Sequence, residues 1–258
     1  MADTVLEQCK WLQQPDGSRL AWCGAAKPDG VTIVFLAGHG SDMAGTKALA
    51  TAEWAAAQGH GMIRFDYFGH GISDGNLLDG TISRWKQDCL AIIDQIAEGR
   101  LVLVGSSLGG WLMILAALAR PERVAALVGI AAAPDFTEDL IWDELDEPRR
   151  RQALAEGRIT EPNPYDPEGE VVYPMTLIED GRKNLVLRSA LPLHCPVRLL
   201  HGMEDAEVPW QTAEKLASVI RGCDTEVILA EGAGHRFSEP DQLDLLISTL
   251  AEVTRRIH

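Results

Sequence analysis

Three residues that are far apart in the sequence have the side-chain types of an acyl-transfer site. They are Ser107, Asp205 and His235. A serine hydroxyl attacks a carbonyl poorly at neutral pH unless a base removes its proton. A neutral histidine can take that proton because it titrates near physiological pH. A carboxylate can fix the tautomer of the imidazole and stabilise its charged form. The order serine, acid, histidine therefore indicates nucleophilic catalysis on an acyl group.

Two neighbouring residues offer alternatives to this assignment. Glu204 is the alternate acid, but Asp205 has the context Asp-x-x-Val-Pro and is preferred. Ser106 is the alternate nucleophile, and we expect it to belong to the end of a strand. Each preferred residue lies a few residues past a predicted strand, and parallel strands end on the same side of a sheet. The three side chains can therefore converge there.

Ser107 lies at the centre of Gly105-Ser106-Ser107-Leu108-Gly109. The apolar run Leu101 to Val104 before it predicts a strand buried on both faces, and the helix formers after Gly109 predict a helix. The two glycines remove Cβ atoms where the strand and the helix pass closely. This Gly-x-Ser-x-Gly pattern resembles the nucleophile elbow of the α/β-hydrolases.

Two backbone N–H groups are candidates for the oxyanion hole. Leu108 opens the predicted helix, so its N–H has no acceptor within that helix. The glycine-rich turn 37–42 follows the predicted strand Val31 to Leu36, where the α/β-hydrolases supply the second donor. We assign that donor to the backbone of His39 and expect its imidazole to line the pocket or to be structural.

Other polar residues in the sequence receive structural interpretations. Asp66, His70 and Asp74 follow the predicted strand 62–65, and loop side chains of these types commonly bind their own backbone. The run 149–151 consists of three arginines. We interpret it as a solvated helix face, with a docking patch for an acidic group as the alternative.

The remaining elements follow from hydrophobic patterning and turn residues. Thr4 to Gln14 and Ser18 to Ala25 predict a hairpin around a Pro-Asp-Gly turn. Residues 135–193 are acidic, rich in proline and irregular, and we expect them to form a lid (cap) between the core segments 1–134 and 194–258. Further predicted strands are 124–130, 196–200 and 227–229; predicted helices are 46–58, 81–98, 142–155, 176–187 and 242–256, with another beginning at Pro209 and a linker at 162–165.

Composition excludes several classes of function. The 258 residues carry a net charge of −15, which disfavours nucleic acid and anionic membrane surfaces as partners. No apolar run is long enough to span a bilayer. Five cysteines, at positions 9, 23, 89, 195 and 223, lack metal-ligand spacing, so we expect unpaired thiols and a reducing compartment. The first ten residues lack a targeting pattern, and a cytoplasmic location is expected unless a presequence was removed.

Several segments beyond the elbow resemble the abhydrolase-domain palmitoyl-protein thioesterases, which are mitochondrial and also act on acyl-glucuronides. The resemblance implies an α/β-hydrolase fold with a mostly parallel eight-stranded sheet, flanking helices and a helical lid. It also implies a catalytic triad of Ser107, Asp205 and His235, no cofactor, and ester or thioester substrates that are small molecules or acylated proteins. The turn Ala37-Gly38-His39 departs from the Pro-Gly-Tyr of that family. The matching segments are 45–50, 63–67, 73–76, 104–113 and 198–203.

The sequence therefore predicts a cofactor-free serine hydrolase of carboxylic esters or acyl thioesters. Two alternatives remain at this stage. The fold also carries ligand-binding proteins with little or no turnover, and it carries hydrolases of C–C bonds. A serine at position 107 excludes the related hydrolases that use an aspartate nucleophile.

Overall fold

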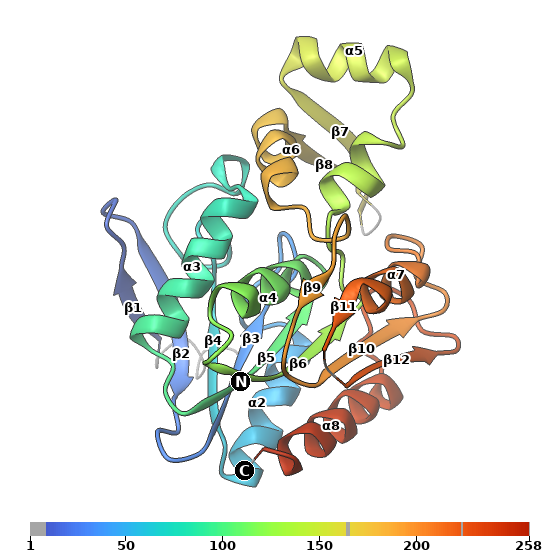
Figure 1. Cartoon of the computed structure of the whole chain (residues 1–258). Helices are drawn as coiled ribbons and strands as arrows, with labels where there is room; N and C mark the ends of the chain where they lie inside the picture. Colours follow the sequence, from blue (N-terminus) through green and yellow to red (C-terminus); the bar gives the residue numbers. More distant parts are fainter. Residues whose placement is uncertain (1–8, 164–165, 223, 258) are drawn as a thin grey trace.

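The computed structural model describes residues 9–163, 166–222 and 224–257, and its centre is an eight-stranded sheet (Figure 1). The sheet order is β1-β2-β4-β3-β5-β6-β10-β12. β2 pairs antiparallel with β1 and β4, and the other neighbours are parallel. The mostly parallel eight-stranded sheet is thereby confirmed. The strands are β1 (Lys10–Gln13), β2 (Arg19–Ala25), β3 (Val31–Leu36), β4 (Gly61–Phe65), β5 (Arg100–Ser106), β6 (Val124–Ile130), β10 (Val197–Gly202) and β12 (Thr225–Ala230).

Helices cover both faces of the sheet because its central strands are apolar on both sides. In β3, Ile33 and Phe35 pack with helices α2 and α8, whereas Val34 and Leu36 pack with helices α3 and α4 on the other face. The helices are α2 (Thr46–Gln58), α3 (Ile82–Gln95), α4 (Leu108–Ala119), α7 (Gln211–Val219) and α8 (Pro240–Arg255), with a 3₁₀ turn at Leu77–Asp79. Within the described residues, no helix combines the length and apolarity needed to cross a membrane.

Residues 135–193, which we call the inserted segment, contain a β-hairpin in addition to the two expected helices. A hairpin of β7 and β8 lies between two short helices, and Figure 1 shows these elements projecting together beyond the sheet. The two expected helices are therefore present but shorter, and the hairpin between them was not predicted. Its elements are a π-helix (Thr137–Trp142), α5 (Glu147–Glu156), β7 (Arg158–Asn163), β8 (Asp166–Pro174), α6 (Met175–Gly181) and a 3₁₀ turn (Arg182–Asn184); β9 (Leu191–Pro192) then pairs with β11 (Ile220–Arg221).

The hairpin has a physical explanation in the sequence. Ile159 lies opposite Tyr173, and Thr160 lies opposite Val172, so β-branched and aromatic side chains pair across the strands. Pro162 was expected to belong to a linker, but it lies in β7 beside a register shift, which is a position where proline is tolerated in a strand. The remainder of the predicted linker, residues 164–165, lies outside the described residues.

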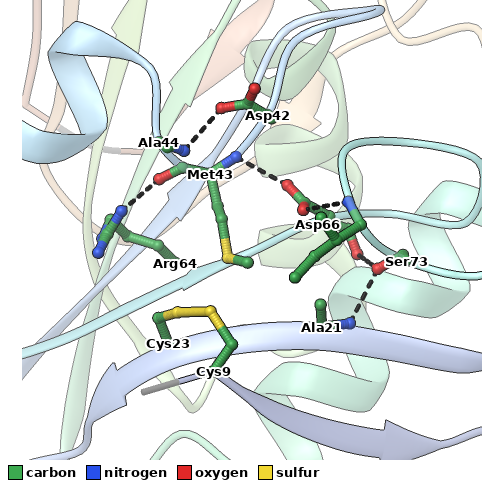
Figure 2. Close-up of a disulfide and its surroundings, with 10 residues drawn as sticks. Cys9, Ala21, Cys23, Asp42, Met43, Ala44, Arg64, Asp66 and Ser73 are labelled. Carbon is green, nitrogen blue, oxygen red and sulfur yellow. Dashed lines mark hydrogen bonds between the residues drawn. A yellow bond between two sulfur atoms is a disulfide. The ribbon is translucent and has the colours of Figure 1, made fainter. Parts of the chain in front are cut away.

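The amino-terminal hairpin contains a disulfide that the sequence analysis did not predict. Cys9, directly before β1, is bonded to Cys23 of β2 (Figure 2). The antiparallel register places Lys10 opposite Trp22, and therefore brings these two cysteines face to face. The expectation of unpaired thiols is wrong for this pair, and it no longer supports a reducing compartment. Cys89 is a buried free thiol and Cys195 is also buried, whereas Cys223 and the predicted strand residues 4–8 lie outside the described residues.

Candidate active site

Ser107 sits in a strained turn between β5 and α4. Its φ is 52° and its ψ is −118°, a conformation that costs free energy in a residue with a side chain. The turn is possible because its flanking glycines lack Cβ atoms. A Cβ on Gly105 would lie 2.3 Å from the carbonyl oxygen of Gly109, and a Cβ on Gly109 would lie 2.0 Å from that of Leu36. Helix α4 therefore passes close to β5 and β3, and Ser107 lies at the carboxyl end of β5.

The three residues predicted from the sequence form a continuous hydrogen-bonded chain. His235 Nε2 is 3.0 Å from Ser107 Oγ, and His235 Nδ1 is 2.8 Å from Asp205 Oδ2. A carboxylate can only accept, so Nδ1 carries the proton and donates it. Nε2 is then free to accept the serine hydroxyl. This arrangement matches the hydrogen-bond pattern of a nucleophile, a base and an orienting acid.

Asp205 is held as a buried, charged acceptor. Its Oδ1 accepts from the backbone N–H groups of Glu207 and Val208, at 2.9 and 2.8 Å. Burial alone would raise the pKa of Asp205, but hydrogen bonds from His201 and His235 outweigh burial and hold this pKa well below its usual range. The carboxyl group is therefore ionised whenever His235 needs a negative partner.

His201 lies next to Asp205, and the sequence had suggested no role for this histidine. It lies in β10 and is fully buried. Its Nε2–H donates to the carbonyl oxygen of Val208 at 2.9 Å and is 3.3 Å from Asp205 Oδ2. Its Nδ1 is buried and has no partner among the described residues. His201 thus ties the acid-bearing loop to the sheet and shares the carboxylate oxygen that His235 uses.

Both predicted oxyanion donors lie beside Ser107. Leu108 is the first residue of α4, so its N–H has no acceptor within the helix. The turn containing His39 passes close by, because a Cβ on Gly38 would lie 3.4 Å from the Cβ of Ser107. Ser107, Leu108 and His39 all line the same cavity. The assignment of the two N–H groups to an oxyanion hole stays a prediction.

The imidazole of His39 lines that cavity within a group of aromatic side chains. Its ring centroid is 5.6 Å from that of Tyr173 in β8, 5.7 Å from that of Trp85 and 6.1 Å from that of His70. Burial, together with the nearby His70, lowers the pKa of His39 to about 4, so the ring is neutral at pH 7. His39 therefore joins the core to the inserted segment through ring contacts.

The loop from β3 to α2 is held by hydrogen bonds with Arg64 of β4 and with Asp66 and His70, two residues for which the sequence suggested structural roles. Asp66 Oδ1 accepts from the N–H of Met43 at 2.7 Å, and Arg64 donates to the carbonyl oxygen of Met43 (Figure 2). His70 Nε2 accepts from the N–H of Gly40 at 3.2 Å. These contacts fix the loop that carries His39.

Two further structural interpretations agree with the contacts. Asp74 forms an ion pair with Arg19 at 3.0 Å. In the arginine run, Arg149 pairs with Glu161, and the guanidinium of Arg150 lies over the ring of Trp142. These side chains are engaged within the chain, as expected for a helix surface.

A cavity of about 1040 Å³ joins the triad to the inserted segment. Its apolar lining includes Phe136, Leu140 and Ile141, which come from the inserted segment, and Leu77 from the core. The part of the chain described by the structure holds no group of His, Cys, Asp or Glu residues arranged to bind a metal ion. The cavity presents an activated serine next to space for an apolar acyl group.

Known proteins are similar to this chain in both sequence and fold. A family model described as the Alpha/beta hydrolase family matches residues 33–244. The chain belongs to this family. The mouse protein named Palmitoyl-protein thioesterase ABHD10, mitochondrial, is 43% identical over 225 residues, which cover 87% of this chain and 75% of that protein. Several such relatives carry the word mitochondrial in their names, and these names do not support a cytoplasmic location for this chain.

Solved structures agree with this membership. Alpha/beta hydrolase domain-containing protein 10 from mouse has a TM-score of 0.91 at 40% identity, covering 97% of this chain and 100% of that chain. A solved protein from Agrobacterium vitis S4 has a TM-score of 0.90 at 36% identity, covering 96% of this chain and 98% of that chain. The fold is therefore shared along nearly the whole length.

Proposed function

We propose that this protein is a serine hydrolase that cleaves carboxylic esters or acyl thioesters through an acyl-Ser107 intermediate. The observation that carries the proposal is the hydrogen-bonded chain from Ser107 through His235 to Asp205. Membership of the Alpha/beta hydrolase family supports the same activity.

In the proposed reaction, His235 Nε2 takes the proton of Ser107 as its oxygen attacks the acyl carbon. Asp205 accepts from Nδ1–H and stabilises the imidazolium that forms. The backbone N–H groups of Leu108 and His39 stabilise the oxyanion, and one such donor is typically worth about 3 kcal/mol. His235 then gives the proton to the leaving oxygen or sulfur, and it later activates the water that releases the acid.

We further propose that the inserted segment is a lid over the core segments 1–134 and 194–258, and that it encloses the acyl chain. Apolar residues of this segment, Phe136, Leu140 and Ile141, line the cavity and support this role. The names of the thioesterase relatives support fatty S-acyl groups, on small molecules or on proteins, as substrates. Acyl-glucuronides are the alternative that the sequence resemblance implies. A cytoplasmic location stays a prediction, with mitochondria as the alternative.

The test is to replace Ser107 and compare it with its neighbour. Ser107→Ala should lower kcat/KM for an S-acyl thioester by at least about 1000-fold, because the nucleophile is lost. Ser106→Ala is the matched control, since this hydroxyl takes no part in the hydrogen-bonded chain. A fluorophosphonate probe should label wild type and Ser106→Ala but not Ser107→Ala. Tight thioester binding without turnover by wild type would instead indicate a ligand-binding protein.

A further inference from the structure

Two cationic side chains line the cavity that contains Ser107 and His235. Lys47 comes from the first turn of α2, and Arg236 directly follows His235. The Lys47 ammonium donates to the carbonyl oxygen of Arg236, so it lies next to the loop that carries the proposed base. The chain has 23 basic and 38 acidic residues, so two cations gathered here stand against its overall charge.

Within the described part of the chain, no carboxylate forms an ion pair with Lys47. No carboxylate among the described residues lies within 4.0 Å of its Nζ, whereas Lys215 is 2.8 Å from Asp139. Burial and the charge of Arg236 lower the pKa of Lys47 to about 8, which shows that its surroundings disfavour the ammonium. Lys47 also lies near the positive end of the α2 dipole, where a cation is unfavourable. An anionic ligand would offset all three effects.

Five carboxylates line the same cavity as Lys47 and Arg236. Asp42 is the nearest of them in sequence to Lys47, and its Oδ1 accepts from the N–H of Ala44. The others come from the inserted segment or from the loop after β10, and they are Glu144, Glu161, Glu170 and Glu207. Lys47 and Arg236 place two positive charges at the end of the cavity formed by α2 and the loop of His235.

The proposed mechanism fixes which part of the substrate meets that end. His235 must deliver a proton to the leaving oxygen or sulfur, so the leaving group lies beside His235. We infer that Lys47 and Arg236 form a subsite for an anionic substituent, a carboxylate or a phosphate, on the leaving group of the ester or thioester. This inference rests on the proposed function for its direction in the cavity, but the binding of an anion can be tested without catalysis.

The test uses two thioesters that differ only in charge. One is the S-hexanoyl thioester of 3-sulfanylpropanoate, and the other is that of 3-sulfanylpropanamide, which is neutral and nearly isosteric. Their dissociation constants are measured by calorimetry with the Ser107→Ala protein, which should bind without turnover. We expect the anionic thioester to bind about tenfold more tightly, which corresponds to about 1.4 kcal/mol. Hexanoyl-coenzyme A against hexanoyl-pantetheine then tests phosphate in place of carboxylate.

The decisive variants are made in the same Ser107→Ala protein. Lys47→Met keeps the aliphatic stem and should reduce the tenfold ratio to about one, whereas Lys47→Arg should preserve most of it. Lys86→Met is the matched control, because Lys86 lies on α3 and is not among the residues lining this cavity. The ratio should survive in that control.

The outcomes separate the subsite from the activity. Equal binding of the two hexanoyl thioesters, or a tenfold ratio that persists in Lys47→Met, would overturn the anionic subsite. Hydrolysis by wild type is measured separately with the same thioesters. If wild type cleaves neither thioester while the charge preference in binding persists, the proposed function fails and the anion site stands.

Discussion

Replacing Gly109 by alanine tests whether the close approach of α4 to β3 positions the nucleophile. The new Cβ would lie 2.0 Å from the carbonyl oxygen of Leu36 and 2.7 Å from that of Ala37. Real Cβ atoms essentially never come within 3.0 Å of such atoms, so α4 must move by at least about 1 Å. Both contacts are with backbone, and neither can be relieved by a change of rotamer.

The displacement should affect activity and stability together. Ser107 precedes α4 directly, so it moves with the helix relative to His235. A misplacement of about 1 Å typically costs about 100-fold in rate, and overpacking costs about 1–3 kcal/mol of unfolding free energy. We therefore expect kcat/KM for an S-acyl thioester to fall by about two orders of magnitude, with a lower urea midpoint.

Gly129→Ala in β6 is the matched control. Its Cβ would meet the end of the Leu199 side chain at 3.0 Å and the Cβ of Ala132 at 3.4 Å. Because the Leu199 side chain can shift, we expect a loss below about 1 kcal/mol and near-wild-type turnover. If Gly109→Ala retained wild-type kcat/KM and stability, the steric account of the elbow would be refuted.

Three further predictions concern polar groups around the core. His201→Leu removes the ring that donates to Val208 O and lies 3.3 Å from Asp205 Oδ2, so the loop carrying Asp205 should be held less firmly and kcat/KM should fall. An unchanged kcat/KM would refute a role of His201 in positioning Asp205. Burial raises the pKa of Asp88 to about 6, so the folded protein holds this proton more tightly than the unfolded chain does, and the resulting stability is lost as pH rises from about 4 to about 6. Asp88→Asn does not titrate, so the unfolding free energy measured in urea should vary with pH by up to about 3 kcal/mol less than in wild type. Asp180→Ala removes the carboxylate of α6 that accepts from the N–H of Ser83 at 2.7 Å, so it should lower the free energy of unfolding by about 1–2 kcal/mol and speed proteolysis of the inserted segment. Asp180→Asn, which keeps an acceptor oxygen, is the milder control.

The core of the fold was predictable because its signals are local. The predicted boundaries of β3, β6 and α2 agree with those of the structure. Continuous apolar runs identify strands buried on both faces, and glycine or proline marks where elements end. The elbow is equally local, because the strand, the glycine spacing and the helix fall within 22 consecutive residues, 99–120.

The inserted segment was predicted less well because its structure depends on pairing. β7 and β8 are stabilised by cross-strand contacts such as Ile159 with Tyr173, which a single strand's sequence does not reveal. The disulfide of Cys9 and Cys23 depends in the same way on the register of β1 and β2. Proline and acidic residues suggested a linker, but tertiary packing places Pro162 within a strand.

The sequence by itself determined the candidate nucleophile, acid and base, since residue type, order and position after predicted strands identify Ser107, Asp205 and His235. Only the tertiary structure decided which other groups meet them. His201 reaches Asp205 because the loop after β10 folds back, and Lys47 reaches the loop of His235 across 189 residues of sequence. The contact of Lys47 depends on how distant segments pack in space, and the contact of His201 with Asp205 depends on the conformation of the loop between them; neither was evident from the residue types alone.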